Sequence, residues 1–431
     1  MTEKPNIILF ITHDQGQFIG CYDSPQTPNS LNTPNLDKLA KEGVRFTNHF
    51  CTAPQCSPSR GSIQTSLYPH QHGLMGLVDR GWTLPSNNKT LPIYLKENGY
   101  TTHLIGLQHE SKDVKILGYD TNTKRKREFS YSCKKMESQY LEFLKEHKND
   151  PKPFYVCIGT WEIHRPFDGW GIPVKPDEVN VPPYLPDHEM IRKDLANYYS
   201  AIHILDKSIG KVTNLLNDLS LRENTVICFT TDHGEPFPRA KCTLYDPGIK
   251  TALLLSYPNI DDLSNGKIVN HMISNLDLLP TLLDLIGVKI PKSIQGKSFL
   301  NYAQEETFRT EIFTEKTFHE YYDPIRSIRT ERYKYIINFE KMNNLYQIDL
   351  FTAHDSAGKY MENLIKAPRP NEEFYDLKED PMELNNIVND SSFRDMILEL
   401  KNQLFKWMKD TNDPILKGKI EDKRTEPIKR Y

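Results

Sequence analysis

Short runs of β-branched and apolar residues recur along the chain, separated by stretches with the hydrophobic spacing of helices. Such runs predict strands because a buried, pleated backbone favours Val, Ile, Thr and aromatic side chains. The predicted strands are Asn6–Thr12, Thr101–Gly106, Phe154–Thr160, Thr225–Thr231, Ala252–Ser256 and Thr310–Thr314. Strands that alternate with helices favour an α/β fold, in which helices cover both faces of a largely parallel sheet.

Helix signals lie between these strands. One helix is predicted to begin at Pro34, with Thr33 as a plausible N-cap, and to end at Gly43. Apolar residues at helical spacing predict a long amphipathic helix over Asp194–Leu216 and a further helix over Asn275–Ile286.

The pattern changes after about Asp323, where the predicted strands become short and lie close together in sequence. They are Tyr333–Asn338 and Asn344–Leu350, and a final helix is predicted from Ser392 to about Lys409. This arrangement predicts a catalytic α/β domain over residues 1–322. A small antiparallel-sheet subdomain with a terminal helix follows over residues 323–431.

Composition narrows the class of protein. The 431 residues are 38% hydrophobic and 26% charged, as in an ordinary globular chain, and the net charge of -3 argues against nucleic acid as a partner. The basic run Lys124–Arg127 is predicted to be a solvated loop, or to steer an anionic sugar if it lies near an active site.

The N-terminal apolar stretch is too short to span a membrane, and no small-residue cleavage site follows it. The 7 cysteines lack paired spacing, which fits a reducing compartment better than a disulfide framework. We therefore expect a cytoplasmic protein with no membrane partner.

Polar side chains of metal-ligand or acid–base type follow several of the predicted strands. Ligands of open α/β sheets bind beyond the carboxyl ends of the strands, so these side chains predict an active-site edge. They are His13 and Asp14 after the first strand, His109 after the second, His164 after the third, and Asp232 and His233 after the fourth.

Four of these residues form a plausible site for a divalent metal. Carboxylates neutralise a cation, and mixed oxygen and imidazole ligands suit Mn²⁺, Zn²⁺ or a tolerant Ca²⁺ site. The predicted ligands are His13, Asp14, Asp232 and His233. The alternative is that Asp232–Gly234 is only a turn after a buried strand.

The segment Cys56–Arg60, with the sequence CSPSR, is the most informative in the chain. Pro58 suits the start of a helix, so Cys56 should lie at a helix N-terminus, where free N–H groups and the helix dipole favour an anion. Arg60 lies one turn further and can return its guanidinium group to the same anion. The spacing between Cys56 and Arg60 is shorter than a phosphatase loop requires, which argues against that chemistry.

CSPSR resembles the Cys-x-Pro-x-Arg signature of the formylglycine-dependent sulfatases, whose Cys is oxidised to formylglycine by a separate maturation enzyme. The resemblance covers nearly the whole chain, through TPNLDKLAKEGVRFTNHF, SLYPHQHGLMG, EIHRPF, FTTDHGEPFP and FYDLKEDPMELNNI. Within the family the chain is most similar to the N-sulfoglucosamine sulfohydrolases, through HQHGLMGL, DHGEPFPRAKCTLYDPG, FHEYYDPIRS and LKNQLFKWMKDTNDP. The resemblance implies an alkaline-phosphatase-like fold: a large mixed, mostly parallel sheet between helices, with a small antiparallel subdomain and terminal helix.

The resemblance also implies roles for individual residues. The implied catalytic residues are Cys56, Arg60, His109, His164 and Lys241. The implied substrate contacts are His164, Lys241, His319 and Glu320. The implied metal ligands are His13, Asp14, Asp232, His233 and Cys56. Cys56, as the formylglycine hydrate, would be the nucleophile, held by Arg60 and hydrogen-bonded by His109.

Two departures from the family pattern bear on these roles. His13-Asp14 stands where the family usually has two aspartates, and Asp232-His233 stands where it has Asp-Asn. Imidazole in place of oxygen favours Mn²⁺ or another transition metal over the family's usual Ca²⁺. Leu107 occupies the position of the lysine that usually clamps the sulfate. Either another part of the site compensates for the lost positive charge, or the enzyme selects a different anion.

The expected reaction is therefore hydrolysis of a sulfate ester or sulfamate on a small sulfated or N-sulfated sugar of glucosamine type. One alternative is a phosphonate monoester or phosphodiester hydrolase on the same scaffold, since such enzymes also carry an Asp-His pair. A second alternative is a non-catalytic anion-binding relative that lost turnover along with the lysine. The other expected partner is the maturation enzyme, and a homodimer is a further possibility.

Overall fold

The computed structural model describes residues 4–22, 31–123, 132–167, 173–302, 307–341, 359–361 and 368–424. The basic run Lys124–Arg127 and the predicted strand Asn344–Leu350 lie outside these residues. Among the described residues, no helix combines the length and the apolar character needed to cross a membrane.

A 9-stranded mixed sheet forms the centre of the larger part of the molecule, in the order β4-β3-β5-β1-β6-β8-β2-β7, with β9 paired to β2. Strand β1 pairs in parallel with both β5 and β6, whereas β8 runs antiparallel to β6. The strands are β1 Asn6–Thr12, β2 Val44–Phe50, β3 Thr101–Gly106, β4 Thr121–Asn122, β5 Phe154–Gly159, β6 Thr225–Thr231, β7 Lys250–Thr251, β8 Leu253–Ser256 and β9 Lys267–Ser274. The predicted mixed, mostly parallel sheet is confirmed.

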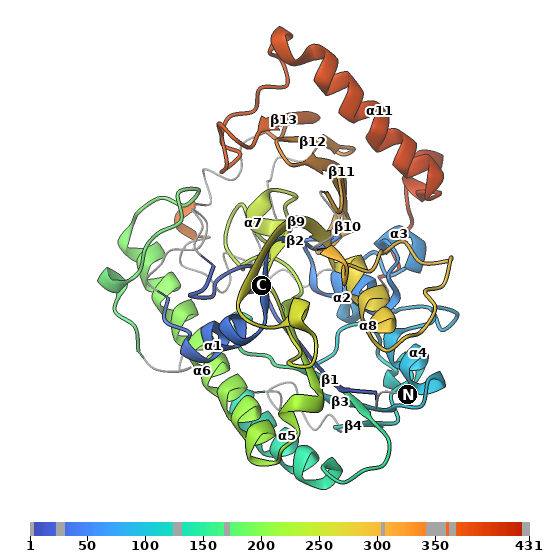
Figure 1. The fold of residues 1–431 in the computed structure, drawn as a ribbon. Coiled ribbons are helices and arrows are strands. Elements are labelled where there is room, and N and C mark those ends of the chain that lie inside the picture. The colour runs from blue at the N-terminus through green and yellow to red at the C-terminus, as the bar shows by residue number, and fades with distance from the viewer. Residues whose placement is uncertain are drawn as a thin grey trace.

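Helices cover both faces of this sheet, as the alternation of buried side chains along β1 requires (Figure 1). Ile8 and Phe10 face a core shared with α1, α5 and α6, whereas Ile7, Leu9 and Ile11 face a core shared with α2, α4 and α8. The helices are α1 Pro34–Glu42, α2 Cys56–Thr65, α3 Pro69–His72, α4 Leu91–Glu97, α5 Cys133–His147, α6 Glu189–Asp218, α7 Asp246–Ile249, α8 Leu278–Leu285 and α11 Arg394–Asp410.

The predicted helices are present with modified ends. Helix α1 begins at Pro34 as expected, but the Thr33 side chain does not cap it, because its hydroxyl accepts from Gly20 N and donates to Asp37 Oδ1 instead. The segment predicted as one helix over Asn275–Ile286 is a 3₁₀ turn, Asn275–Asp277, followed by α8.

A second, 4-stranded antiparallel sheet has the order β10-β11-β12-β13. Helix α11 packs on one face through Leu400, Leu404 and Trp407, and the other face packs against the residues that follow β2 and precede β7. The strands are β10 Glu311–Phe318, β11 Tyr322–Thr330, β12 Tyr333–Asn338 and β13 Glu372–Asp376. The small antiparallel sheet with its terminal helix is thus confirmed. The division after residue 322 stays a prediction, and β10 lies on its N-terminal side.

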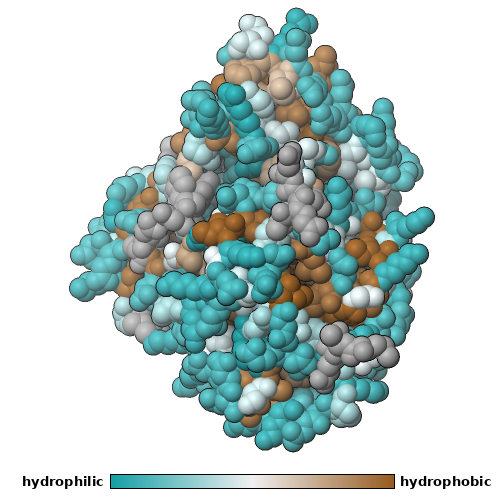
Figure 2. Space-filling view, in the orientation of Figure 1, coloured by the Kyte–Doolittle hydropathy of each residue, from teal (hydrophilic) through white to brown (hydrophobic). Residues whose placement is uncertain are grey.

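The face of the molecule in Figure 2 is largely hydrophilic, with hydrophobic residues gathered near its centre and towards one edge. Such a surface is ordinary for a globular protein. The predicted metal ligands and Cys56 lie where β1, β6 and the start of α2 meet.

Candidate active site

The ends of β1 and β6 bring the first predicted ligands together. The two strands are parallel neighbours, with Thr12 opposite Thr231, so the residues that follow them leave the sheet at the same edge. Asp14 N donates to Asp232 Oδ1 at 3.0 Å, and His13 Nδ1 lies 3.3 Å from Asp232 Oδ2. Asp14 has a positive φ of 46°, an uncommon backbone conformation for a non-glycine residue, of the kind that concentrates at functional sites.

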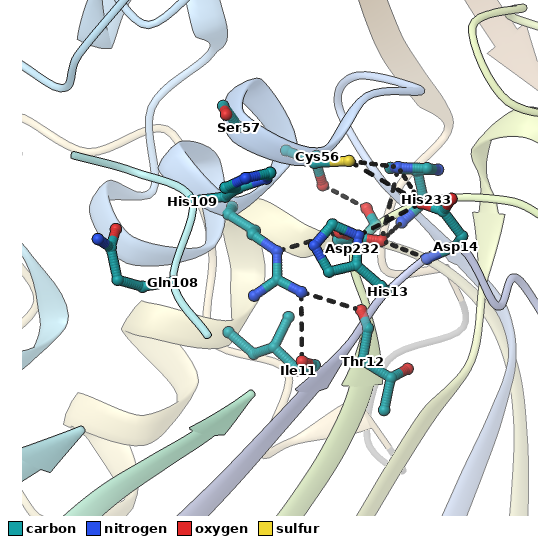
Figure 3. Close-up of polar contacts among 12 residues, drawn as sticks. Ile11, Thr12, His13, Asp14, Cys56, Ser57, Gln108, His109, Asp232 and His233 are labelled. Atoms are coloured by element: carbon teal, nitrogen blue, oxygen red, sulfur yellow. Dashed lines mark hydrogen bonds and ion pairs between the residues drawn. The ribbon is translucent and has the colours of Figure 1, made fainter. Parts of the chain in front are cut away.

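Cys56 is the first residue of α2, as predicted, and its thiol points toward the strand ends (Figure 3). Its Sγ lies 3.3 Å from His233 Nε2 and 3.9 Å from Asp14 Oδ1. The helix start directs unpaired backbone N–H groups toward this point, which favours negative charge there.

Arg60, one turn further along α2, engages the strand ends instead of Cys56. Its Nε donates to Asp232 Oδ2 at 3.0 Å, and one terminal nitrogen donates to the carbonyls of Ile11 and Thr12 at 3.3 and 3.2 Å. The guanidinium group therefore ties the nucleophile helix to β1 and β6. Any direct hold on a sulfate group, as the resemblance implies, stays a prediction.

Asp14 is the residue on which the other side chains converge. Lys241 Nζ donates to its Oδ2 at 2.7 Å, His233 Nε2 lies 3.1 Å from its Oδ1, and His164 Nε2 lies 4.0 Å from its Oδ2. The His109 ring completes the arrangement, since its centroid lies 5.4 Å from that of His13. Residues from four strand ends thus meet around the start of α2.

Burial keeps three imidazoles of the site neutral. It lowers the pKa of His13 to about 3 and the pKa values of His109 and His164 to about 4. Burial alone would raise the pKa of Asp14, but the charge of Lys241 is the largest opposing effect and helps to hold that pKa well below its usual range. Ionised carboxylates beside neutral imidazoles are the protonation states that metal binding requires.

The donor set fits a divalent cation. Ligand atoms of His13, Asp14, Cys56 and Asp232 all lie within 4.8 Å of one another. His13 Nδ1 lies 3.3 Å from Asp14 Oδ1 and from Asp232 Oδ2, and its Nε2 is buried with no hydrogen-bond partner among the described residues, so the ring has a nitrogen available for a ligand. His233 lies outside this set, but its Nε2 is 3.1 Å from Asp14 Oδ1 and 3.3 Å from Cys56 Sγ, while its Nδ1 faces the carbonyl of Gly234 at 2.9 Å. His233 therefore stays a predicted ligand.

Cys56 lines a cavity of about 720 Å³. Its lining includes every residue predicted for catalysis or substrate binding except Arg60, namely Cys56, His109, His164, Lys241, His319 and Glu320. Leu107 also lines it, so the apolar replacement of the family's lysine faces the substrate space.

Several lining residues were not predicted from the sequence, among them Asp79, Arg80, Lys112 and Trp161. Arg80 forms an ion pair of 2.7 Å with Glu320, which joins two segments far apart in the chain. The only sequence signal for Trp161 was its place between β5 and His164. Arg80 carries no motif and could not be singled out.

Comparison with known proteins gives a consistent result. The family model described as Sulfatase matches residues 5–288, and the model described as N-sulphoglucosamine sulphohydrolase, C-terminal, matches residues 237–372. An "Ulvan-active sulfatase" of Formosa agariphila is 27% identical over 95% of this chain and 75% of its own length. The N-sulphoglucosamine sulphohydrolase of Homo sapiens is 28% identical over 95% of this chain and 91% of its own.

Among solved structures, the phosphonate monoester hydrolase of Agrobacterium radiobacter superposes with a TM-score of 0.75 at 19% identity, covering 95% of this chain and 96% of its own. At this identity the likeness shows a shared fold, the alkaline-phosphatase-like architecture expected from the sequence.

Proposed function

The chain belongs to the sulfatase family, and we propose that it hydrolyses a sulfate ester or sulfamate of a glucosamine-type sugar. The observation that carries the proposal is the position of Cys56. This residue begins α2, lines the cavity, and faces Asp14 and His233. The similarity to the human N-sulphoglucosamine sulphohydrolase along most of both chains supports an N-sulfated glucosamine as the substrate.

Cys56 is proposed to act after conversion to formylglycine. The aldehyde hydrate would supply two hydroxyls on one carbon, one to attack sulfur and one to expel sulfate as the aldehyde re-forms. Burial raises the pKa of the Cys56 thiol, so the unmodified side chain is a poor nucleophile at neutral pH. The maturation enzyme, like a homodimer, stays a prediction.

A divalent metal is proposed to bind His13, Asp14, Asp232 and position 56, the donors that lie together in the structure. When bound, it would supply Lewis acidity to the attacking and sulfate oxygens. The imidazole of His13, in place of a carboxylate, favours Mn²⁺ over Ca²⁺ at this position.

The remaining side chains have distinct proposed tasks. Arg60 holds Asp232 in place, and Lys241, bonded to Asp14 and facing the cavity, balances the charge of the bound sulfate. His164 donates its Nδ1 hydrogen to the carbonyl of Arg165, which leaves Nε2 for the cavity side. An anionic sulfate raises the pKa of this imidazole, so His164 gains a proton on substrate binding and can pass it to the leaving atom.

Intact-mass analysis and sulfate release test the proposal together. We expect a mass about 18 Da below that of the unmodified chain, localised to residue 56, which is the change from thiol to aldehyde. The protein should release sulfate from glucosamine N-sulfate, and Cys56→Ala should abolish that release. Cys21→Ala, a change at a half-buried cysteine that does not line the cavity, is the matched control. Undiminished activity in Cys56→Ala would refute the proposal.

A phosphonate or phosphodiester hydrolase is the second candidate, favoured by the Asp232-His233 pair and by Leu107 in the cavity wall. A panel of p-nitrophenyl sulfate with the corresponding phosphonate and phosphodiester separates the two, since preference for the phosphorus compounds would replace the first proposal. Tight sugar binding without product from the matured protein would instead support the non-catalytic alternative.

A further inference from the structure

Trp161 lines the cavity, but the proposed chemistry gives it no role. Its ring lines the cavity and is partly exposed, and it lies against the ring of His164 with centroids 4.4 Å apart and planes inclined by 33°. The ring of His13 lies 5.8 Å away on the metal side. An indole in this position offers a rigid apolar surface directly beside the proposed proton donor.

The turn that carries Trp161 is held from behind by buried residues. Glu162 is 4% exposed and accepts a hydrogen bond from Cys133 N at 2.5 Å, which ties the turn to the start of α5. Ile163 is 0% exposed, packs in the core on the α6 side of the sheet, and has a φ of 83°. A β-branched residue adopts a positive φ only where its surroundings impose it. Two residues of the turn therefore anchor it, while Trp161 and His164 line the cavity.

The same cavity contains paired charges suited to hydroxyl groups. Arg80 and Glu320, 2.7 Å apart, together offer hydrogen-bond donors and acceptors. The chain beyond α11 returns to the Arg80–Glu320 pair. There Arg424 donates to the carbonyl of Glu320, and Lys423 lies 5.0 Å from the Trp82 ring. A pyranose presents an apolar C–H face and a rim of hydroxyls, which matches an aromatic wall with charged neighbours.

We propose that Trp161 is a positioning residue, on whose indole a pyranose ring of the substrate packs so that the leaving oxygen or nitrogen lies beside His164. This inference rests on the proposed sulfatase function and deepens it, because it names the residue that holds the sugar ring beside His164. The contact buries apolar area of the sugar and costs little entropy, since the turn already holds the ring.

Trp161→Ala and Trp161→Phe test the assignment in the full-length matured protein. In Trp161→Ala the KM for glucosamine N-sulfate should rise about tenfold or more, the scale expected for loss of an aromatic contact and its buried area, and Trp161→Phe should restore most of the loss. Inhibition by the product glucosamine should weaken by a similar factor, whereas inhibition by inorganic sulfate should stay unchanged. Tyr360→Ala removes a 42% exposed aromatic ring that does not line the cavity and serves as the matched control.

An unchanged KM, or equal weakening of inhibition by glucosamine and by sulfate, would overturn the assignment, because the second result indicates a general collapse of the site. The two proposals fail in different ways. A parent protein that releases no sulfate from any compound refutes the sulfatase function. A parent that does release it, with Trp161→Ala kinetically identical to it, refutes only the role of Trp161.

Discussion

Two buried clusters in this molecule contain the same kinds of side chain but differ in what can reach them. The first, at the ends of β1 and β6, consists of His13, Asp14, Asp232 and Arg60. The second, between α3, the small sheet and the residues after α11, consists of His70, Glu315, Asp413 and Arg326. Judged only by distances between donor atoms, the histidine and carboxylates of either cluster could hold a metal ion.

Contact with the cavity lining separates the two clusters. In the second cluster Arg326 binds both oxygens of Asp413, at 2.6 and 3.0 Å, and the ring of His70 lies 5.4 Å from that of Trp407. No described member of this cluster lines the cavity. In the first cluster Asp14 also contacts Cys56 and Lys241, both of which line the cavity. We therefore expect the second cluster to serve stability, and the first to serve chemistry because it contacts residues that line a cavity.

Removing a carboxylate from the first cluster should have the largest effect. We expect Asp14→Asn to lower kcat/KM on glucosamine N-sulfate by about 10³-fold or more, because it removes a charged metal ligand and the partner of Lys241. Steady-state kinetics with metal analysis of the purified protein measure both consequences. Full activity with full metal content would show that Asp14 does not hold the metal.

The equivalent change in the second cluster should act on stability instead. Asp413→Asn leaves Arg326, which is 0% exposed, without its bidentate partner, and should lower the free energy of unfolding by about 3 kcal/mol. Chemical denaturation measures the loss, and the folded variant should keep a KM close to that of the parent. If Asp413→Asn instead kept the stability of the parent and lost turnover, the second cluster would serve catalysis and not stability.

The smallest effect concerns which metal the first cluster prefers. We expect the chelator-treated protein to bind Mn²⁺ about tenfold or more tightly than Ca²⁺, and His13→Asp to reduce that preference by replacing imidazole with oxygen. The rise in Tm with added metal reports the affinity without any need for turnover. An unaltered preference in His13→Asp would mean that His13 is not a ligand.

Local patterns predicted much of the fold. Strands β1, β3, β6 and β12 have the bounds expected from their β-branched composition. Strands β2 and β9 were not predicted, since both mix Asn and His with apolar residues. They are strands because they pair with each other across about half the chain, with Arg45 opposite Ile268. Pairing between such distant segments leaves no local signal.

Local sequence patterns likewise predicted part of the site, and long-range packing decided the rest. The segment CSPSR and the polar residues after the strands predicted the helix start at Cys56 and its neighbours Asp14 and Asp232. The contact of Arg60 with Asp232, and that of His233 Nε2 with Cys56 Sγ, depend on side-chain directions that the spacing of residues in the sequence does not contain.

The sequence by itself therefore determined the family, several of the strands and helices, and the chemistry available at the carboxyl edge of the sheet. Those features follow from short-range rules of propensity, helix termini and motif spacing. Tertiary structure alone decided which cluster of His and carboxylates contacts the lining of this cavity, and it placed Trp161 and Arg80 around the cavity. Access to solvent depends on how distant segments pack, and packing is a property of the folded molecule as a whole.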